Sequence, residues 1–350
     1  MKLLLKLRRL NNFQFKSTNK IVNAQRNFHR LRFNYFFKEN LTKVKGKKLL
    51  DAGCGPGVHS IILDEILKNG DNKIFSLDIL NSSIQKLNKL KKKYKSKIIF
   101  SGVHDFTKKL KGNFDYVICQ NWIPHSQNPE KCLINIFDTV PVNGKIYLSI
   151  YHEYNFRWLV SYIARRIIKS SDFKYFLSNE SKLFKKPLMS YGNKDDIFFE
   201  SMICDYFSPT IYLTNYKKII EFFHKYGFQI LNKGSFSPLH HKNDVNLDNH
   251  LVKISFVRKK IIKPKKKIYA FNNIDDYFKN NLKKNSLKNV INCAQKISYY
   301  LKKQSVNERL NFVSKIYEIR AKYSKTQSSK KIDSLFKFMK IKLDAVEKYK

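Results

Sequence analysis

The sequence lacks the features of a secreted, zinc-binding or membrane-spanning protein. Its five cysteines are scattered without a Cys-x-x-Cys pair, so neither a zinc site nor a disulfide framework is indicated. A reducing compartment such as the cytoplasm fits this cysteine usage. No apolar run approaches the roughly 18 residues of a spanning helix. The apolar patch at residues 3–5 is too short for a signal-peptide core, so none is expected.

Acidic residues are also scarce. Only 27 Asp and Glu face 69 Lys and Arg, which gives a formal net charge of +42. Such an excess would attract RNA or an anionic membrane surface. The alternative is compositional, because an AT-rich coding sequence enriches Lys, Asn, Ile, Phe and Tyr. That bias should also enrich the acids, so both explanations stay open.

Glycine is rare as well, yet three of the 11 glycines alternate in the stretch Asp51-Ala52-Gly53-Cys54-Gly55-Pro56-Gly57. A mainly apolar run precedes this stretch, and residues 58–67 have the pattern of a helix. Glycine allows positive φ and close approach of the backbone to a ligand. The first turn of a helix also offers free N–H groups. The stretch therefore predicts a strand, turn and helix that hold a nucleotide-like ligand.

The spacing distinguishes this stretch from other nucleotide motifs. A dinucleotide fingerprint needs Gly-x-Gly-x-x-Gly, but here Val58 occupies the place of the third glycine. No Gly-Lys-Ser/Thr follows, as it would in a P-loop. Asp51 would repel a phosphate and attract a cationic amino group. The stretch resembles motif I of the class I S-adenosylmethionine-dependent methyltransferases.

This resemblance implies both a fold and a cofactor site. Gly53, Gly55 and Gly57 would line the methionine part of S-adenosyl-L-methionine, and Asp51 would anchor its amino group, directly or through water. The alternative is a tight turn that binds nothing. The expected fold is α/β: a Rossmann-like seven-stranded sheet, six strands parallel and the last antiparallel, flanked by helices and followed by a helical C-terminal extension.

Acids after the next two expected strands extend the predicted cofactor site. The strand at 73–78 ends in Asp78, which can accept hydrogen bonds from both ribose hydroxyls. The strand at 97–101 is followed by Asp105 and Phe106. By the resemblance, the acid would bind the adenine amino group and the phenyl ring would pack on the base.

The fourth expected strand, at 114–120, runs into Asn121-Trp122-Ile123-Pro124-His125. Open parallel sheets bind ligands beyond the carboxyl ends of their strands, so this segment should face the transferable methyl group, with Asn121 in the cofactor site. It differs from the Asn-Pro-Pro-aromatic signature of nucleobase amine methyltransferases and is similar to a segment of small-molecule and lipid methyltransferases. His125 is a candidate general base. A packing or hydrogen-bonding role is the alternative.

Residues 151–212 are too many for a plain connection after the fifth strand. We expect a lid that forms the acceptor pocket. Tyr151 is one candidate acceptor contact. Asp205 and Tyr212 are two others, by resemblance to a subgroup of bacterial methyltransferases. The basic, aromatic helix expected at 156–168 could instead lie on an anionic membrane.

Composition suggests three regions. Residues 1–40 form a basic arm with a helix at 27–37 that either closes over the cofactor or packs on the sheet. An organellar transit peptide is the alternative for residues 1–38, which contain no acid. Residues 41–260 form the methyltransferase domain, with strands expected at 227–234 and 251–258. Residues 261–350, rich in lysine, form a helical extension that could hold RNA, anionic lipid or a partner, or be solvated.

The sequence thus predicts an S-adenosylmethionine-dependent methyltransferase that acts on a small-molecule, lipid-like or cell-envelope acceptor. The alternatives are an RNA methyltransferase that uses the basic segments and a noncatalytic cofactor-binding scaffold. No metal is expected, because no Cys or acid cluster accompanies the histidines at 240, 241 and 250. The expected location is cytoplasmic, with peripheral membrane binding as an option. The oligomeric state is left open.

Overall fold

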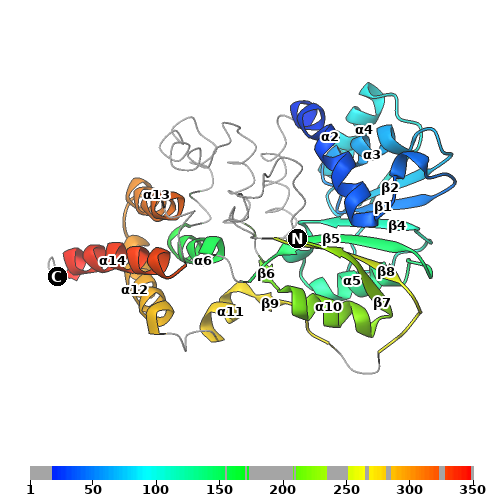
Figure 1. Cartoon of the computed structure of the whole chain (residues 1–350). Helices are drawn as coiled ribbons and strands as arrows, with labels where there is room; N and C mark the ends of the chain where they lie inside the picture. Colours follow the sequence, from blue (N-terminus) through cyan, green and yellow to red (C-terminus); the bar gives the residue numbers. More distant parts are fainter. Residues whose placement is uncertain are drawn as a thin grey trace. The chain divides into compact units, whose positions relative to one another are not determined.

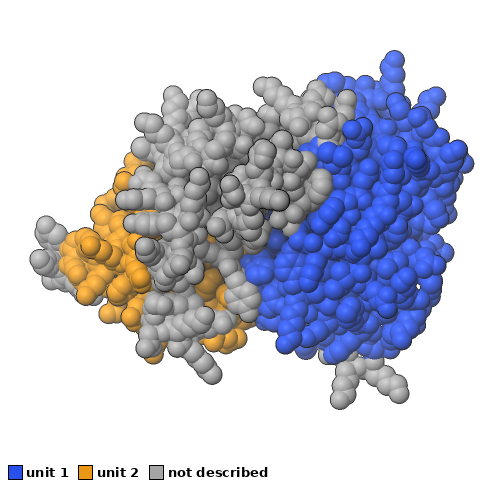
Figure 2. Space-filling view, in the orientation of Figure 1, with its two compact units in different colours: residues 1–153, 209–244, 249–272 blue, residues 154–208, 245–248, 273–350 orange. Residues whose placement is uncertain are grey.

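The chain folds into two compact units (Figure 2). Unit 1 consists of residues 1–153, 209–244 and 249–272, and unit 2 of residues 154–208, 245–248 and 273–350. The computed structural model describes residues 18–153, 156–169, 172, 208, 210–234, 251–264, 268–280, 285–322 and 328–347. Unit 2 joins the segment that follows the fifth strand to the C-terminal helices, whereas the sequence placed these two segments in separate regions.

Unit 1 is built on a seven-stranded sheet with the order β3-β2-β1-β4-β5-β8-β7. β8 is antiparallel to both β5 and β7, and the other neighbours pair in parallel, which confirms the predicted fold. The five strands for which ranges are predicted above begin and end within two residues of those ranges. The strands are β1 (Lys48–Ala52), β2 (Lys73–Asp78), β3 (Ile99–Val103), β4 (Tyr116–Gln120), β5 (Lys145–Tyr151), β7 (Phe228–Lys233) and β8 (Leu251–Arg258).

Helices cover both faces of this sheet (Figure 1). One face carries α2 (Thr18–Phe37), α3 (Val58–Leu67) and α4 (Asn81–Lys93), and the other carries α5 (Pro129–Phe137) and α10 (Tyr216–Lys225). The short helices η1 (Leu41–Lys43) and η2 (Ile123–His125) precede β1 and follow β4. The strand order reverses between β1 and β4, and ligands of such sheets bind at this switch point.

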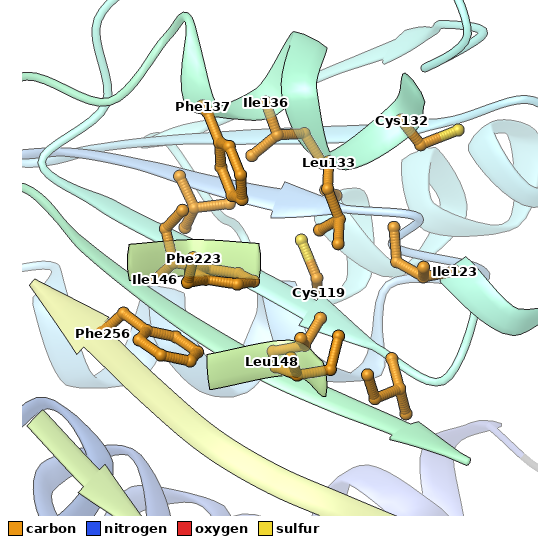
Figure 3. Packing of buried hydrophobic residues seen from close by; sticks show 14 of the residues in the cluster. Cys119, Ile123, Cys132, Leu133, Ile136, Phe137, Ile146, Leu148, Phe223 and Phe256 are labelled. Atoms are coloured by element: carbon orange, nitrogen blue, oxygen red, sulfur yellow. The ribbon is translucent and has the colours of Figure 1, made fainter. Parts of the chain in front are cut away.

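Aromatic side chains attach the helices to the sheet. On the α2 face, Phe36 packs on Tyr147 of β5 with ring centroids 4.5 Å apart. On the opposite face, Phe223 of α10 stacks on Phe256 of β8 at 3.9 Å (Figure 3). Phe137 of α5 joins the same cluster. Both faces of β4 and β5 are therefore buried, which fixes the carboxyl ends of these strands.

The described residues of unit 2 are mainly helical. They form α6 (Phe156–Ile167), α11 (Ile274–Asn280), α12 (Asn285–Leu301), α13 (Val306–Lys322) and α14 (Ser328–Glu347). The short strands β6 (Tyr212–Leu213) and β9 (Asn272–Asn273) and the helix α11 were not predicted. Arg309 forms a bidentate pair with Asp172, with 2.6 Å from Nη2 to Oδ1 and 3.0 Å from Nε to Oδ2, and both residues are buried.

The burial of α6 bears on the predicted membrane alternative. Residues 157–164 are all buried, and Trp158 and Tyr162 are among the largest fully buried side chains. These aromatic side chains are therefore not available to lie on a membrane surface. Within the ranges described above, every helix is too short or too polar to span a bilayer.

Glu39 ties the end of α2 to two strands of the sheet. Its Oε2 accepts hydrogen bonds from the Tyr116 hydroxyl and from Lys145 Nζ, each at 2.6 Å. Lys145 Nζ also donates to the carbonyl of Phe37 at 3.0 Å. Burial raises the pKa of Glu39, but the hydrogen bonds from Lys145 and Tyr116 outweigh it and hold the pKa below its usual value.

We predict that Glu39→Gln lowers the free energy of unfolding at pH 7 by about 1 kcal/mol, because a charge-assisted hydrogen-bond pair is weakened. A depressed carboxyl pKa stabilises the fold above the unfolded pKa, and this contribution is lost as the pH falls. The difference between the two proteins should therefore shrink below about pH 4. Urea unfolding at pH 7 and below pH 4 measures the loss of unfolding free energy and its change with pH. Glu221→Gln, at an exposed position on α10, is the control. An equal loss of unfolding free energy in the two variants would contradict a specific contribution of the Glu39 hydrogen bonds.

Candidate active site

The glycine turn after β1 has a shape that only glycine allows at two positions. Gly53 has φ +66°, and a Cβ there would lie 2.3 Å from Cγ of Trp122. Gly57 has φ +89°, and a Cβ there would lie 2.2 Å from Cδ1 of Leu87. Gly57 also precedes α3 without a side-chain cap, so the first N–H groups of that helix face the turn.

Asp78 is held against this turn. Its Oδ2 accepts the backbone N–H of Gly55 at 2.9 Å, and its Oδ1 accepts that of Leu80 at 2.8 Å. Burial raises the pKa of this carboxyl. A carboxylate oxygen with one bond retains a lone pair for a second donor. The geometry is compatible with two ribose hydroxyls, and the ribose role of Asp78 stays a prediction.

Asp51 lies in the floor of the site. It is buried, and its Oδ2 accepts the Ser60 hydroxyl at 2.6 Å, while Ser60 accepts the Ser76 hydroxyl at 2.8 Å. Burial raises the pKa of Asp51 to about 7, the Ser60 hydrogen bond opposes this shift, and the charge of Asp78 adds to it. A cationic group beside Asp51 would favour the ionised carboxylate, as expected if it anchors an amino group.

Asp105 and Phe106 follow β3, as predicted. Oδ1 of Asp105 accepts the N–H and the hydroxyl of Thr107 at 2.9 and 2.8 Å. Phe106 is buried and packs on Trp122, with ring centroids 4.7 Å apart. The predicted adenine contacts stay a prediction.

Asn121 and His125 lie beyond the end of β4. Asn121 has φ +60°, its N–H donates to the Ser149 carbonyl, and its Oδ1 accepts the Ser149 hydroxyl, both at 2.8 Å. Nε2 of His125 lies 2.7 Å from the Tyr151 hydroxyl, and its Nδ1 lies 3.3 Å from the Thr210 carbonyl. A carbonyl only accepts, so the proton belongs on Nδ1 and Nε2 accepts from Tyr151.

The other predicted acceptor contacts are less well placed. The Tyr212 hydroxyl donates to the Gln127 carbonyl at 3.3 Å, and Asp205 lies outside the described residues, as do the three loop histidines. The structure therefore brings His125 and Tyr151 together and leaves the roles of Asp205 and Tyr212 as predictions. In the described part of the chain, no group of three His, Cys, Asp or Glu is arranged to hold a metal ion.

Sequence reasoning assigned no role to Arg32. Its guanidinium is 4% exposed and donates to Oε1 of Gln120 at 2.6 Å. It lies over the rings of Phe33 and Tyr147, 5.1 and 5.6 Å from their centroids. Within the described part of the chain, its Nε has no hydrogen-bond partner. Gln120 ends β4 beside Asn121, so this cation could hold the carboxylate of a methionine moiety. The only sequence signal was an arginine within an aromatic helix.

The sequence patterns assigned no role to Trp122, which follows Asn121 after β4. Its indole packs against Gly53 and Phe106, so it forms a wall of the site. Its Nε1 is buried and has no hydrogen-bond partner among the described residues.

Comparisons with known proteins match part of the chain to methyltransferases. A family model described as a methyltransferase domain matches residues 43–185. Ubiquinone biosynthesis O-methyltransferase of Escherichia coli O7:K1 is 27% identical over 155 residues, which cover 42% of this chain and 62% of that protein. The chain thus spans about three-fifths of the length of the curated relatives it matches.

Two solved structures overlap the chain in part. Magnesium protoporphyrin IX methyltransferase from Synechocystis PCC 6803 has a TM-score of 0.39 and 15% identity, covering 71% of this chain and 84% of that one. An S-adenosylmethionine-dependent methyltransferase from Mesorhizobium loti has a TM-score of 0.42 and 14% identity, covering 62% and 93%.

The chain carries a methyltransferase domain of the class I S-adenosylmethionine-dependent type. The cofactor of this family is S-adenosyl-L-methionine. The residues of the site fit such a ligand. The uncapped start of α3 offers N–H groups at the glycine turn, and Asp78 is fixed against this turn. Among the described residues, the buried guanidinium of Arg32 has no acidic partner.

We predict that the affinity for S-adenosylhomocysteine, which retains the amino group, rises about tenfold between pH 6 and pH 8. Asp51 with a pKa near 7 is largely protonated at pH 6, and only its ionised form pairs with the ammonium group. Titration calorimetry at a series of pH values measures this affinity. Asp51→Asn should bind more weakly and without this pH dependence. A variant that kept the wild-type profile would assign the titration to another group.

Proposed function

We propose that this protein transfers the methyl group of S-adenosyl-L-methionine to a hydroxyl of a small-molecule or lipid-like acceptor. The observation that carries the proposal is the pair formed by His125 and Tyr151, with 2.7 Å between Nε2 and the hydroxyl oxygen. His125 follows β4, and Tyr151 is the last residue of β5, so the pair lies at the same edge of the sheet as the glycine turn.

The bound cofactor supplies an electrophilic methyl group, and the protein has to place a nucleophile against it. Positioning of this kind accounts for up to roughly 7–11 kcal/mol of a barrier. In the proposed cofactor site, Asp51 and Arg32 hold the two charged groups of the methionine part and Asp78 holds the ribose. The acceptor hydroxyl lies against the Tyr151 oxygen.

The proton of the acceptor hydroxyl then leaves through the pair. It passes to the Tyr151 oxygen while the Tyr151 proton moves to Nε2 of His125, so that Tyr151 ends unchanged and the imidazole gains one proton. The Nδ1 proton stays hydrogen-bonded to the Thr210 carbonyl, which orients the ring and stabilises its positive charge. A hydroxyl acceptor needs such a base, whereas an amine acceptor does not.

The comparisons support this acceptor class. The curated relative acts in ubiquinone biosynthesis as an O-methyltransferase, and a hydroxyl acceptor accords with a site that contains a base. Because the match covers about three-fifths of that protein, the particular acceptor does not transfer to this chain.

The decisive experiment uses the full chain, S-adenosylmethionine labelled in its methyl group and a fractionated extract of the cells that make the protein. Label in low-mass or lipid fractions supports the proposal. Label in RNA alone favours the second candidate, an RNA methyltransferase, which the net charge of +42 and the exposed lysines of α4 make reasonable. Failure to bind S-adenosylhomocysteine in calorimetry would contradict both and leave a noncatalytic role.

We predict that His125→Ala lowers the rate of label transfer about 10²–10⁴-fold, the usual contribution of a general base. The affinity for S-adenosylhomocysteine should change little, because the base is not placed in the cofactor site. Tyr151→Phe should also slow transfer, and His224→Ala, at an exposed position of α10, should not. A His125 variant with wild-type rates would remove the proton-transfer step from the proposal.

A further inference from the structure

A cluster of basic side chains lies between α2 and the sheet face that this helix covers. Arg32 and His29 of α2 are 4% and 2% exposed, and Lys253 of β8 is half-buried beside them. The charges of Arg32 and Lys253 both act on His29, and that of Arg32 acts on Lys253. His59 of α3 packs edge-on against His29, with ring centroids 4.6 Å apart.

As far as the described residues go, the cluster contains two cations and no negative charge. Across the described residues, no carboxylate forms an ion pair with Arg32 or with Lys253. The polar neighbours are neutral: Gln120 accepts from Arg32, and Tyr147 lies below its guanidinium. Burial, and to a smaller extent the charge of Arg32, lowers the pKa of Lys253 to about 8. Unpaired buried charge is costly, and an anionic ligand would remove that cost.

The strand register places Lys253 relative to the reacting pair. Gln120, Ser149 and Lys253 are direct partners across β4, β5 and β8, so their side chains lie on one face. Tyr151 is two residues beyond Ser149 and shares this face. Its direct partner is Leu251, which makes Lys253 its diagonal neighbour, at a separation of about 7–8 Å.

One anion does not serve both cations equally well. The carboxylate of the methionine part, if held by Arg32, lies beside Gln120 at the end of β4. The strand that carries Lys253, β8, is separated from β4 by β5, and the backbones of β4 and β8 are about 10 Å apart, so an anion held beside Gln120 lies nearer the end of β4 than the backbone of Lys253. The lysine is therefore left for a second anionic group, on the side of the site where Tyr151 meets the acceptor.

We propose that Lys253 binds a carboxylate or phosphate group of the methyl acceptor, so that the enzyme selects acidic acceptors. This inference rests on the proposed function, because the acceptor hydroxyl is taken to lie against Tyr151. An acceptor of this class carries its acidic group several ångströms from the hydroxyl that is methylated. Neutral analogues then bind less tightly, since they leave the ammonium group buried without a partner.

The test uses the full chain saturated with S-adenosylhomocysteine and inorganic phosphate as the probe. Thermal unfolding is followed as phosphate replaces chloride at constant ionic strength. We expect saturable stabilisation of the wild type, and a dissociation constant about tenfold higher for Lys253→Met, which keeps the apolar stem but loses the charge-assisted hydrogen bond. Lys253→Arg should restore binding. Lys233→Met, an exposed lysine of β7, is the matched control.

Three outcomes would overturn the inference: no saturable response in the wild type, an equal loss in Lys233→Met, or a response that depends on Arg32 and not on Lys253 once the cofactor product is bound. The last result would assign the anion site to the cofactor alone. Binding of S-adenosylhomocysteine is measured separately for every variant. A Lys253-dependent phosphate site in a protein that fails to bind S-adenosylhomocysteine would contradict the proposed methyl transfer and not the anion site.

Discussion

The candidate site depends on one steric constraint, the path of the backbone between β1 and α3. Gly53 and Gly57 adopt positive φ, and the indole of Trp122 and the side chain of Leu87 occupy the space where a Cβ would lie. The same turn delivers the N–H of Gly55 to Asp78. A side chain at either glycine would displace the wall formed by Trp122 or the packing of α4. The turn thus links Asp78, Trp122 and the start of α3 in one rigid unit.

Most of the sheet could be predicted because its signals are local. Strands end in acids or glycines within a few residues, as at Asp51 and Asp78, and each such ending marks the ligand edge of a parallel sheet. His125 was predicted for the same reason, since it follows β4 directly. The division into units was not accessible in this way. Composition changes at residue 261, whereas unit 2 is defined by packing between α6 and helices more than a hundred residues later in the chain.

The residues that sequence reasoning missed have long-range partners. Arg32 meets Gln120 across 88 positions. Lys253 enters the same cluster only because β8 inserts between β5 and β7. No sequence period, spacing or motif signals either contact. The raised pKa of Asp51 could not be predicted from the sequence either, because it comes mainly from burial in the folded protein.

The discontinuous make-up of unit 2 has a consequence for synthesis on the ribosome. α6 leaves the exit tunnel well before α12 and α13, against which it packs in the folded protein. Asp172 likewise leaves the tunnel long before Arg309, its partner in the buried ion pair. During that interval an aromatic helix and a carboxylate meant for burial are exposed on the nascent chain. Synthesis therefore has to proceed past α13 before the helix and the buried ion pair are protected, and a product that ends before α12 would present a surface that chaperones and proteases recognise.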